Sequence, residues 1–396
     1  MELRFMYDGF ALSVRGYKHI VENIARQDSA MFHVDPEGWA MAAVADGHGG
    51  DEYFRSHVGS RLAVESALRS VRDCFQEKEA FREALYRNAD EILHRLESNI
   101  INNWNTLIRR FNEDPQTFDW NSPSDTLYET TEEDAEAPIQ DGISPGWEEK
   151  WMAEHDVEIN EDCPERMYGS TLLVAVMTAE FCFSLQIGDG CCVLAYPDGH
   201  ARIMIPLDES KPRNLTNSLC ENNALKNFRH DYVLYQKEQS RSEAEPANAL
   251  DREDGTVTQT AQISEMEITE AAEEGSVPEM SDISAVNTSD ISESIYEGEP
   301  ALETEAAKER AHAAVPAGII LSTDGLFNSF ARETYPETFL RFNCRVLGNM
   351  EPSVRNDFSN KLETHLNERS EKGSKDDISI ALIFDRNMDY EAVKPG

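Results

Sequence analysis

The sequence lacks any hydrophobic run long enough to cross a membrane. A transmembrane helix needs about 18 to 20 consecutive apolar residues, and no stretch of the 396 residues approaches that length. The opening residues Met1 to Phe10 include the charged Asp8 and no apolar core of the kind found in secretory signals. We therefore expect a cytoplasmic protein that is neither inserted in a membrane nor secreted.

Cysteine is also sparse, and its seven copies follow no regular spacing. An odd number without a framework argues against structural disulfides and fits a reducing compartment. Cys191 and Cys192 are adjacent, and neighbouring side chains of a strand point to opposite faces. We expect these two residues to be structural and not bridged to each other.

Positive charge is scarce, with 36 Lys and Arg against 75 Asp and Glu, for a net charge of −39. The acidity is concentrated in two segments: residues 112–165 carry −17 and residues 236–310 carry −15, which leaves about −7 elsewhere. Such a balance excludes nucleic acid and anionic membrane as partners, because both would be repelled.

The two acidic segments divide the chain into five parts. The second is rich in Glu, Ser, Thr and Ala and poor in aromatics, so it cannot bury enough apolar surface to offset its ordering entropy. In the first, Trp147, Trp151 and Met152 at helical spacing predict a short helix that docks on the core. We expect a core built from residues 1–111, 167–235 and 313–396, a partly ordered insert 112–166 and a disordered insert 236–312.

Apolar patterning predicts an α+β fold, a sandwich of antiparallel sheets with segregated helices. The predicted strands follow one another along the chain and do not alternate with helices, which disfavours a doubly wound fold. Apolar runs predict strands at 41–45, 171–176, 181–187, 192–196, 203–206, 319–321 and 378–384. Apolar residues at intervals of three and four predict helices at 52–75, 79–111, 336–347 and 354–367.

Three of the apolar strands end in the same dipeptide, Asp-Gly. The aspartates are Asp46, Asp189 and Asp324, and the last strand is preceded by Asp376 and Asp377. One Asp-Gly alone is more typical of a turn than of a ligand. Antiparallel strands, however, could bring these carboxylates to one rim, where they would repel each other unless a hard cation bound. The pattern predicts a site for Mg²⁺ or Mn²⁺.

Five short blocks occur in order and together resemble the signature blocks of the metal-dependent Ser/Thr protein phosphatases of type 2C. The stretch 13–16 with His19, Gln27 and Asp28, and the run 214–219, are similar to the bacterial-type branch. The resemblance covers residues 11–111, 167–235 and 316–385. The blocks are Asp46-Gly47-His48-Gly49-Gly50, Gly169-Ser170-Thr171, Gly188-Asp189-Gly190, Ser322-Thr323-Asp324-Gly325 and Gly373-Ser374-Lys375-Asp376-Asp377-Ile378-Ser379.

The resemblance implies two antiparallel β-sheets flanked by α-helices, with two Mn²⁺ or Mg²⁺ ions at one end and a weaker third. Asp46 would bridge the two metals, and the Gly47 carbonyl would bind one of them. Asp324 and Asp376 would complete the shell of the other metal, and Asp28 would act through metal-bound water. Asp189 would hold the third metal. Asp377 stands where many members have Asn and would be a supporting residue.

The same resemblance implies hydrolysis of phosphoserine and phosphothreonine in proteins, and hence a role in signalling beside a cognate Ser/Thr kinase. A metal-bridging hydroxide would attack phosphorus, and His48 would protonate the leaving alkoxide as general acid. An isolated histidine is more often an ordinary surface or core residue, which is the alternative for His48.

The residue that contacts the substrate phosphate is left open. Members of the family usually have an arginine near the N-terminus, and here the candidates are Lys18, His19 and Arg26, with Arg15 nearby. Lysine would act as a point charge without the bidentate geometry of arginine. His19 is balanced between a phosphate contact and a structural role.

Two other functions fit the same residues. The chain could be a catalytically weak or dead module that binds phosphoproteins as a scaffold, or a hydrolase of small phosphoesters. Retention of Asp46, Asp324 and Asp376 favours the enzyme, since a dead site has no reason to keep the whole set. The acidic inserts would favour basic substrates or recruit a basic partner.

Overall fold

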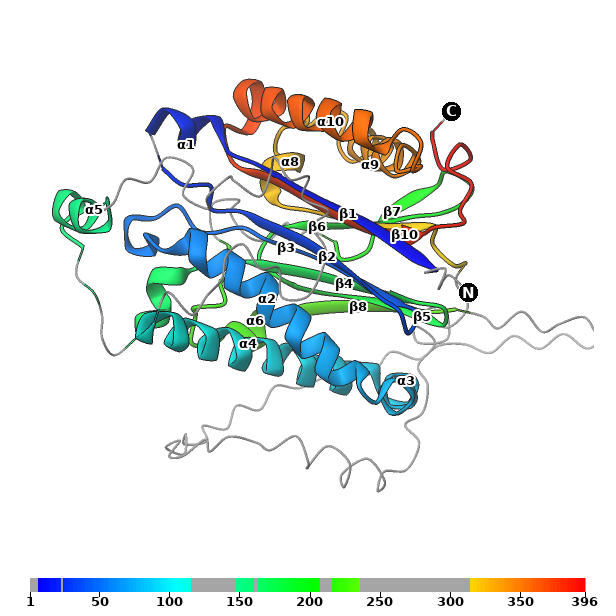
Figure 1. The fold of residues 1–396 in the computed structure, drawn as a ribbon, viewed down its shortest axis with the longest axis horizontal. Helices are drawn as coiled ribbons and strands as arrows, with labels where there is room; N and C mark the ends of the chain where they lie inside the picture. Colours follow the sequence, from blue (N-terminus) through cyan, green and yellow to red (C-terminus); the bar gives the residue numbers. More distant parts are fainter. Residues whose placement is uncertain are drawn as a thin grey trace, which may run out of the picture. The chain divides into compact units, whose positions relative to one another are not determined.

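Two antiparallel sheets stack on each other in the computed structural model, which describes residues 6–22, 24–114, 147–157, 159, 163–206, 216–235 and 314–395. Within these residues each sheet has five strands (Figure 1). The first sheet has the order β1 (Tyr7–Val14), β10 (Ile378–Asp385), β9 (Gly318–Ser322), β6 (Cys191–Ala195) and β7 (Ala201–Ile203). The second has the order β2 (Ser29–Asp35), β3 (Trp39–Ala45), β4 (Leu172–Thr178), β5 (Phe181–Ile187) and β8 (Arg229–Leu234).

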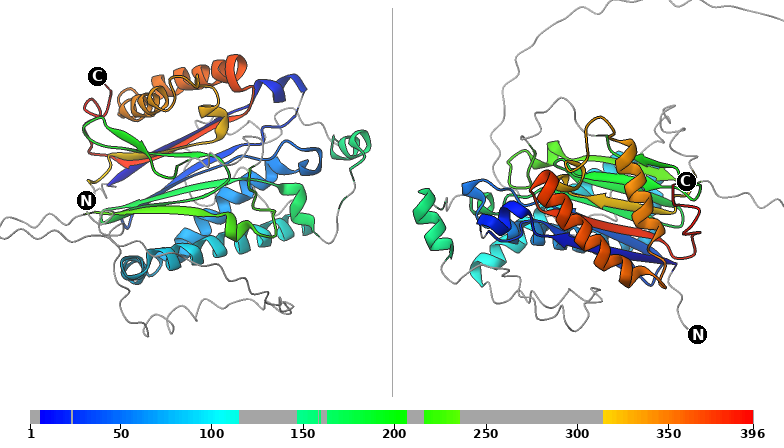
Figure 2. Two further views of the ribbon diagram at one scale, coloured as in Figure 1. Left: turned by 180° about the vertical axis from the view of Figure 1, so that it is seen from behind. Right: turned by 90° about the horizontal axis from the view of Figure 1, so that it is seen from above.

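Helices cover the outer face of each sheet, as Figures 1 and 2 show. The second sheet is covered by α2 (Ser56–Phe75) and α4 (Ala89–Glu113), with α3 (Lys78–Arg87) beside them, and the first by α9 (Glu337–Gly348) and α10 (Arg355–Arg369). The predicted α+β sandwich is therefore confirmed. The shorter elements are α1 (Tyr17–Glu22), α5 (Trp147–His155), α6 (Ala224–Asn227), α8 (Asp324–Phe327), η1 (Asp51–Tyr53), η4 (Pro164–Tyr168) and η6 (Ser370–Ser374).

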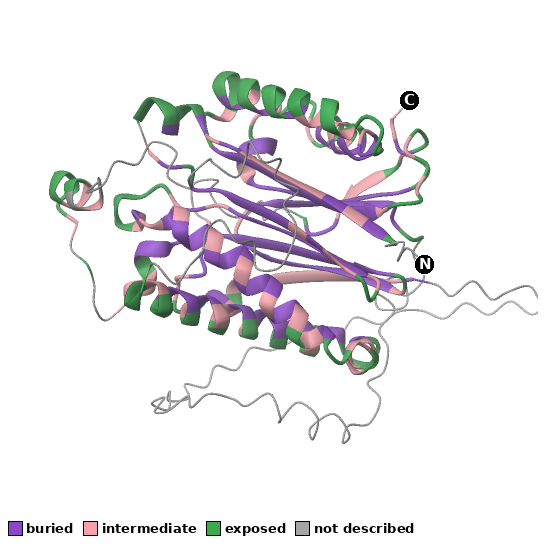
Figure 3. Ribbon diagram, viewed as in Figure 1, coloured by how far each residue is buried: buried purple, intermediate pink, exposed green. Residues whose placement is uncertain are grey.

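The core has three apolar layers, one between the sheets and one under each set of helices. Along β3, Ala42 and Val44 face the other sheet, whereas Met41 and Ala43 face the helices. The central strands, which lie between two of these layers, are buried on both faces, while the outward faces of the helices are exposed (Figure 3). Burial on both faces explains why the central strands are continuous apolar runs in the sequence.

The adjacent cysteines lie in different layers of this core. Cys191 packs in the layer under α9 and α10, and Cys192 packs between the sheets. All seven cysteines are free thiols. The prediction that these two residues are structural and unbridged is confirmed.

The predicted helix 79–111 is wrong in one respect, because the chain breaks at Asn88 into α3 and α4. The side chain of Asn88 accepts a hydrogen bond from the Glu91 main-chain N–H at 3.4 Å, and its amide donates to the Glu91 carboxylate at 3.0 Å. Because Asn88 caps the N-terminus of α4 in this way, α3 ends there and a new helix begins. The first long helix also begins later than predicted, at Ser56, after the short turn η1.

Three strands were not predicted, so the chain opens with three strands where the sequence indicated one. β1, β2 and the edge strand β8 are only partly buried and carry polar residues such as Asp8 and Asp231. Their apolar runs are therefore interrupted. β7 lies at Ala201–Ile203, two residues before the run predicted at 203–206.

The short helix predicted inside the first acidic insert is present as α5. Its Glu148 forms an ion pair with Arg55 at 2.7 Å, and Trp151 Nε1 donates to the main-chain carbonyl of Asp51 at 3.3 Å. The predicted docking is therefore confirmed. Most of the rest of the insert 112–166, and all of the insert 236–312, lie outside the described residues, so the five-part division stays a prediction.

Among the helices that the structure describes, none is both long enough and apolar enough to cross a membrane.

Candidate metal centre

The strand-end aspartates meet at one end of the sandwich, the end at which α1 lies in Figure 1. Asp46 follows β3, Asp189 joins β5 to β6, Asp324 opens α8 after β9, and Asp376 precedes β10. The register explains the meeting, because Ser322 of β9 pairs with both Cys191 and Ile380. Antiparallel neighbours thus begin and end at the same rim, as predicted.

The charges of these carboxylates act on one another. Burial, followed by the charges of Asp28, Asp324 and Asp376, raises the pKa of Asp46 well above its ordinary value. Burial and the charges of Asp189 and Asp376 raise the pKa of Asp324 to about 7. Burial also raises the pKa of Asp28 well above its ordinary value, with repulsion from other carboxylates adding to it. Mutual repulsion of this kind requires that the carboxylates lie close together.

This donor set fits a hard divalent cation. The causes that raise the pKa of Asp46 are burial and the charges of four other carboxylates, those of Asp28, Asp324, Asp376 and Asp189. Oxygen ligands with excess negative charge suit Mg²⁺ or Mn²⁺. The described side chains do not place three His, Cys, Asp or Glu groups around one point. A cation would therefore draw further ligands from main-chain oxygens and water, as Mg²⁺ commonly does.

The main chain around Asp46 and Gly47 is held tightly. The Thr171 N–H donates to the Asp46 carbonyl at 2.8 Å, and the Asp46 N–H donates to Thr171 Oγ1 at 2.9 Å. A Cβ at Gly47 would lie 2.7 Å from the carbonyl oxygens of both Gln27 and Ser56. Only glycine fits here, so the backbone can approach the cluster closely.

Asp28 is oriented by a residue to which the sequence assigned no role. Thr323 Oγ1 donates to Asp28 Oδ2 at 2.7 Å and accepts from the Ser379 N–H at 2.9 Å. Thr323 thus connects the N-terminal segment to β9 and β10. The only signal was its place beside Asp324 in a signature block, because nothing local shows a contact between residues 295 apart.

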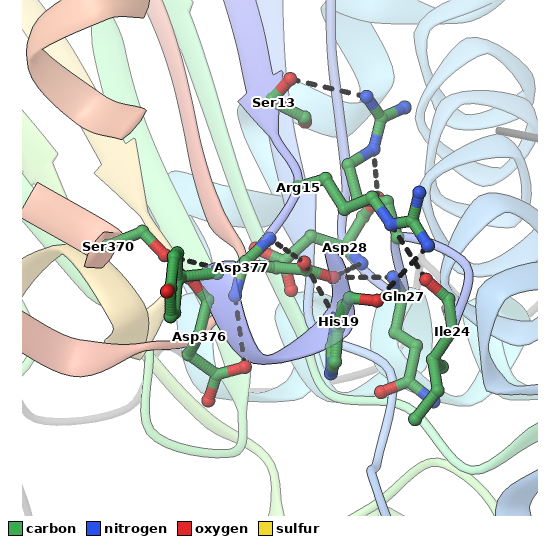
Figure 4. Close-up of polar contacts among 12 residues, drawn as sticks. Ser13, Arg15, His19, Ile24, Gln27, Asp28, Ser370, Asp376 and Asp377 are labelled. Carbon is green, nitrogen blue, oxygen red and sulfur yellow. Dashed lines mark hydrogen bonds and ion pairs between the residues drawn. The ribbon is translucent and has the colours of Figure 1, made fainter. Parts of the chain in front are cut away.

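Asp377 is only 2% exposed, and its carboxylate accepts hydrogen bonds from several parts of the chain. Its Oδ1 accepts from the Gly16 N–H at 2.5 Å, and its Oδ2 accepts from the N–H groups of Gln27 at 2.5 Å and Asp28 at 3.2 Å (Figure 4). A fourth bond joins Oδ1 to His19 Nδ1 at 2.8 Å. Asp377 therefore fastens the loop that carries Asp28 to the start of β10.

His48 lies half-buried two residues beyond Asp46. Its ring meets the edge of Tyr53 at a centroid distance of 5.0 Å, and a Cβ at Gly169 would lie 2.8 Å from His48 Cδ2. The glycine therefore leaves room for the ring. Burial lowers the pKa of His48 to about 4, so the free protein holds this imidazole neutral at pH 7.

Asp189 is positioned by a turn and one hydroxyl. Gly188 before it has a φ of +100°, a conformation that favours glycine. Thr216 Oγ1 donates to Asp189 Oδ1 at 3.0 Å, and burial raises the pKa of Asp189.

The predicted phosphate contacts divide into two groups. Arg26 donates to the carbonyl oxygens of Asp28 at 3.3 Å and Ser13 at 3.2 Å, so it ties the loop together. Lys18 is exposed, and its charge lowers the pKa of Asp376, as does that of His19. Lys18 and His19 therefore lie within electrostatic reach of the carboxylates. No contact of these residues with phosphate is tested by the structure, so this assignment stays a prediction.

A family model described as protein phosphatase 2C matches residues 15–367 of the chain. No curated protein sequence matches it. Among solved structures, PppA, described as a key regulatory component of T6SS in Pseudomonas aeruginosa, is 13% identical over 96% of this chain and 97% of that chain, with a TM-score of 0.41. The serine/threonine phosphatase PstP/Ppp of Mycobacterium tuberculosis is 12% identical over 96% and 98%, with a TM-score of 0.40. The serine/threonine phosphatase of S. agalactiae is 13% identical over 96% and 99%, with a TM-score of 0.39.

Proposed function

The chain belongs to the protein phosphatase 2C family and is a metal-dependent protein Ser/Thr phosphatase, and we propose from this how its carboxylate end works. Two Mn²⁺ or Mg²⁺ ions would be held by Asp46, the Gly47 carbonyl, Asp324 and Asp376. Asp28 would act through bound water, and Asp189 would hold a weaker third ion.

The observation that carries the proposal is the excess of negative charge at one end of the sandwich, where Asp28 is buried and Asp46 and Asp324 are half-buried. Burial is the largest cause that raises the pKa of Asp28, Asp46 and Asp324, and the charges of neighbouring carboxylates, Asp376 in all three cases, raise it further. In a protein that used these residues only for structure, a Lys or Arg would be expected among them, because uncompensated buried charge is costly. A pair of divalent cations supplies the missing positive charge.

Divalent cations bound there would supply a nucleophile at neutral pH, because a cation lowers the pKa of a water that it binds from about 15.7 to about 7. The residues of the chain then have separate tasks. Thr323 and Asp377 hold Asp28 in place. His48 gives a proton to the departing serine or threonine oxygen. The negative charge of a bound phosphate would favour the protonated imidazole, which burial alone disfavours.

Phosphoproteins are the substrates, and a cognate Ser/Thr kinase is the implied partner in a signalling cycle. The seven unpaired thiols favour a reducing compartment such as the cytoplasm.

The first experiment is hydrolysis of a phosphothreonine peptide with Mn²⁺, Mg²⁺ or EDTA, by wild type and Asp46→Ala. We expect turnover only with metal and none in the variant. Glu97→Gln is a matched control, since Glu97 is a buried carboxylate on α4 outside the cluster. A folded wild type that turns over nothing with either metal would contradict the proposal and favour a phosphoprotein-binding scaffold.

The role of His48 is tested by varying the leaving group. His48→Gln should slow phosphopeptide hydrolysis by about 10² to 10⁴-fold, because a serine or threonine alkoxide needs a proton. The aryl oxide of an aryl phosphate leaves without taking up a proton, so the hydrolysis of that substrate should fall much less. Equal losses on both substrates would show that His48 is not the proton donor.

A further inference from the structure

Two short segments hold His48 between them. The ring of Tyr53, in η1, meets the His48 ring at a centroid distance of 5.0 Å, and the Gly169 carbonyl accepts the His48 main-chain N–H at 3.0 Å. Gly169 directly follows η4, and a Cβ there would lie 2.5 Å from Tyr53 Cδ1 and 2.8 Å from His48 Cδ2. The three residues are packed together, so a shift of either segment is transmitted to the His48 ring.

Arg55 joins these two segments. Its main-chain N–H donates to the Met167 carbonyl of η4 at 3.0 Å, and its Nη1 donates to the Tyr168 hydroxyl at 3.0 Å. The guanidinium also lies over the Tyr168 ring, 5.8 Å from the ring centroid. Arg55 stands two residues after Tyr53, and Tyr168 directly precedes Gly169. The position of Arg55 therefore determines how η1 and η4 lie on either side of His48.

Glu148 of α5 holds Arg55 in turn. Its carboxylate accepts from Arg55 Nη2 at 2.7 Å and from Arg55 Nε at 3.1 and 3.2 Å. Contacts from two nitrogens of one guanidinium fix its orientation as well as its place. Burial opposes the charge of Arg55, but the hydrogen bond to Glu148 helps to outweigh burial and to raise the pKa of Arg55. The side chains are 21% and 29% exposed, so this is not a freely solvated surface ion pair.

The helix α5 has a second anchor on the same segment. Trp151 Nε1 donates to the Asp51 carbonyl at 3.3 Å, and His155 Nδ1 lies 3.1 Å from Asp51 Oδ1. The Trp151 and His155 rings stack at 3.9 Å. Figure 1 shows α5 at the same end of the sandwich as α1. The helix therefore contacts both ends of the segment 51–55, which leads from the His48 loop into α2.

We propose that α5 positions the general acid. Glu148, acting through Arg55, holds η1 and η4 so that the His48 imidazole stays within reach of the leaving oxygen. This inference rests on the proposed phosphatase function and on the proton transfer from His48 within it. Glu148 and Arg55 are positioning residues, since neither touches the strand-end carboxylates or the substrate. Part of the insert 112–166 thereby serves the reaction.

The test is Glu148→Ala, measured on two substrates that differ in their need for a proton. A phosphothreonine peptide releases an alkoxide that must be protonated, whereas p-nitrophenyl phosphate releases a stable aryl oxide. Glu154→Ala is the matched control, because Glu154 is also on α5 but pairs with Lys150 of the same helix, at 3.7 Å. His48→Gln is measured beside them, with the Mn²⁺ affinity and thermal melting of every protein.

We expect Glu148→Ala to lower kcat on the phosphopeptide by roughly 10 to 100-fold, because a displacement of about 1 Å can cost about 10²-fold. The rate on p-nitrophenyl phosphate and the Mn²⁺ affinity should stay within about threefold of wild type, since neither depends on the proton from His48. Glu148→Gln keeps one acceptor oxygen and should recover part of the loss. Glu154→Ala should match wild type on both substrates.

A double variant tests the route through Arg55. In an Arg55→Ala background, Glu148→Ala should add no further loss on the phosphopeptide, because the two residues act through one contact. A full further loss would show that Glu148 acts by another route and would overturn the inference.

Equal losses on both substrates would also overturn the inference, because a merely structural role of α5 affects both rates alike. Unchanged phosphopeptide turnover in Glu148→Ala would do the same. Should Glu148→Ala fail to melt cooperatively, Glu148→Gln decides, with a smaller loss confined to the phosphopeptide expected and unchanged rates contradicting the inference. A loss confined to the phosphopeptide in His48→Gln but absent from Glu148→Ala would overturn this inference alone, whereas a wild type without turnover would overturn the proposed function.

Discussion

Two regions of the described structure hold buried or half-buried carboxylates, and the surroundings of these carboxylates differ between the two regions. At the end of the sandwich, burial and the charges of neighbouring carboxylates raise the pKa of Asp28, Asp46 and Asp324. On the outer layer, Glu97 of α4 is 1% exposed but accepts from His230 Nδ1 at 2.8 Å and from His94 Nδ1 at 3.2 Å.

The difference shows which carboxylates belong to the fold. Glu97 has its counter-charges within the chain and joins α4 to β8 through His230. Among the residues that the structure describes, Asp28, Asp46 and Asp324 form no ion pair of this kind, so their energetic balance depends on a cation from solution. Removing the carboxylate of Glu97 should therefore destabilise the fold, whereas removing a strand-end aspartate should stabilise the metal-free protein.

The largest expected effect is on turnover. Loss of a residue that only supports a metal ligand costs about 10 to 100-fold, so Asp46→Asn, which removes a shared ligand, should lose about 1000-fold or more in kcat/KM. Glu97→Gln should keep wild-type turnover per folded molecule. Initial rates with a phosphothreonine peptide and saturating Mn²⁺ measure both, and similar losses in the two variants would erase the distinction between the regions.

The next effect is on stability, in the opposite region. Glu97→Ala leaves two imidazoles without their acceptor and should lower the free energy of unfolding by about 2 to 3 kcal/mol. Glu97→Gln should recover part of that loss, since its amide oxygen still accepts. Urea unfolding measures the difference, with Glu113→Ala at the exposed end of α4 as control. A loss below about 0.5 kcal/mol would mean that the cluster is an ordinary surface ion pair.

In metal-free protein, removing a strand-end charge should stabilise the fold. The pKa of Asp324 is raised from 3.8 to about 7 by burial, Asp189 and Asp376. A group with a raised folded pKa gives stability that is present below its unfolded pKa and is lost as pH rises through the folded value. Asp324→Asn in EDTA should therefore gain about 1 kcal/mol at pH 8 and nothing near pH 4.

Thermal melts in EDTA and in Mn²⁺ provide the check on Asp324→Asn. With Mn²⁺ the order should reverse, because only wild type gains the full free energy of metal binding. A variant that melts below wild type in EDTA at pH 8 would show that the aspartates are not in net repulsion.

The smallest effect concerns His230. Its hydrogen bond to Glu97, opposed by burial and aided by the charges of Glu97 and Asp90, raises its pKa above 6.5. Its contribution to stability is therefore full below pH 6.5 and lost as pH rises through the folded pKa. Relative to His230→Gln, wild type should gain about 0.5 to 1 kcal/mol in going from pH 9 to pH 5.5. Urea unfolding at both pH values measures the difference in the free energy of unfolding between the two proteins. An equal difference at both pH values would exclude a charged His230–Glu97 pair.

The strand-end aspartates could be predicted because their signal is local. Central strands buried on both faces give apolar runs such as β9, and Asp324 stands two residues after the end of β9. Antiparallel pairing then predicts that the aspartates meet, because it brings the ends of neighbouring strands to the same rim of the sheet. The helix α5 was likewise visible from the spacing of its apolar residues.

Contacts between distant parts of the chain could not be predicted. The bond between Thr323 and Asp28 joins residues 295 apart, and that between Asp377 and His19 joins residues 358 apart. The spacing of residues along the sequence does not indicate either of these hydrogen bonds. The edge strand β8 was missed for a different reason, because its partly exposed faces break the apolar pattern.

The most direct test of the account is a calorimetric titration of Mn²⁺ into metal-free wild type, Glu97→Gln and Asp46→Asn. We expect two strong Mn²⁺ sites in wild type and in Glu97→Gln, and loss of strong binding in Asp46→Asn. Equal binding in all three proteins, or none in folded wild type, would contradict the claim that the strand-end carboxylates exist to hold metal.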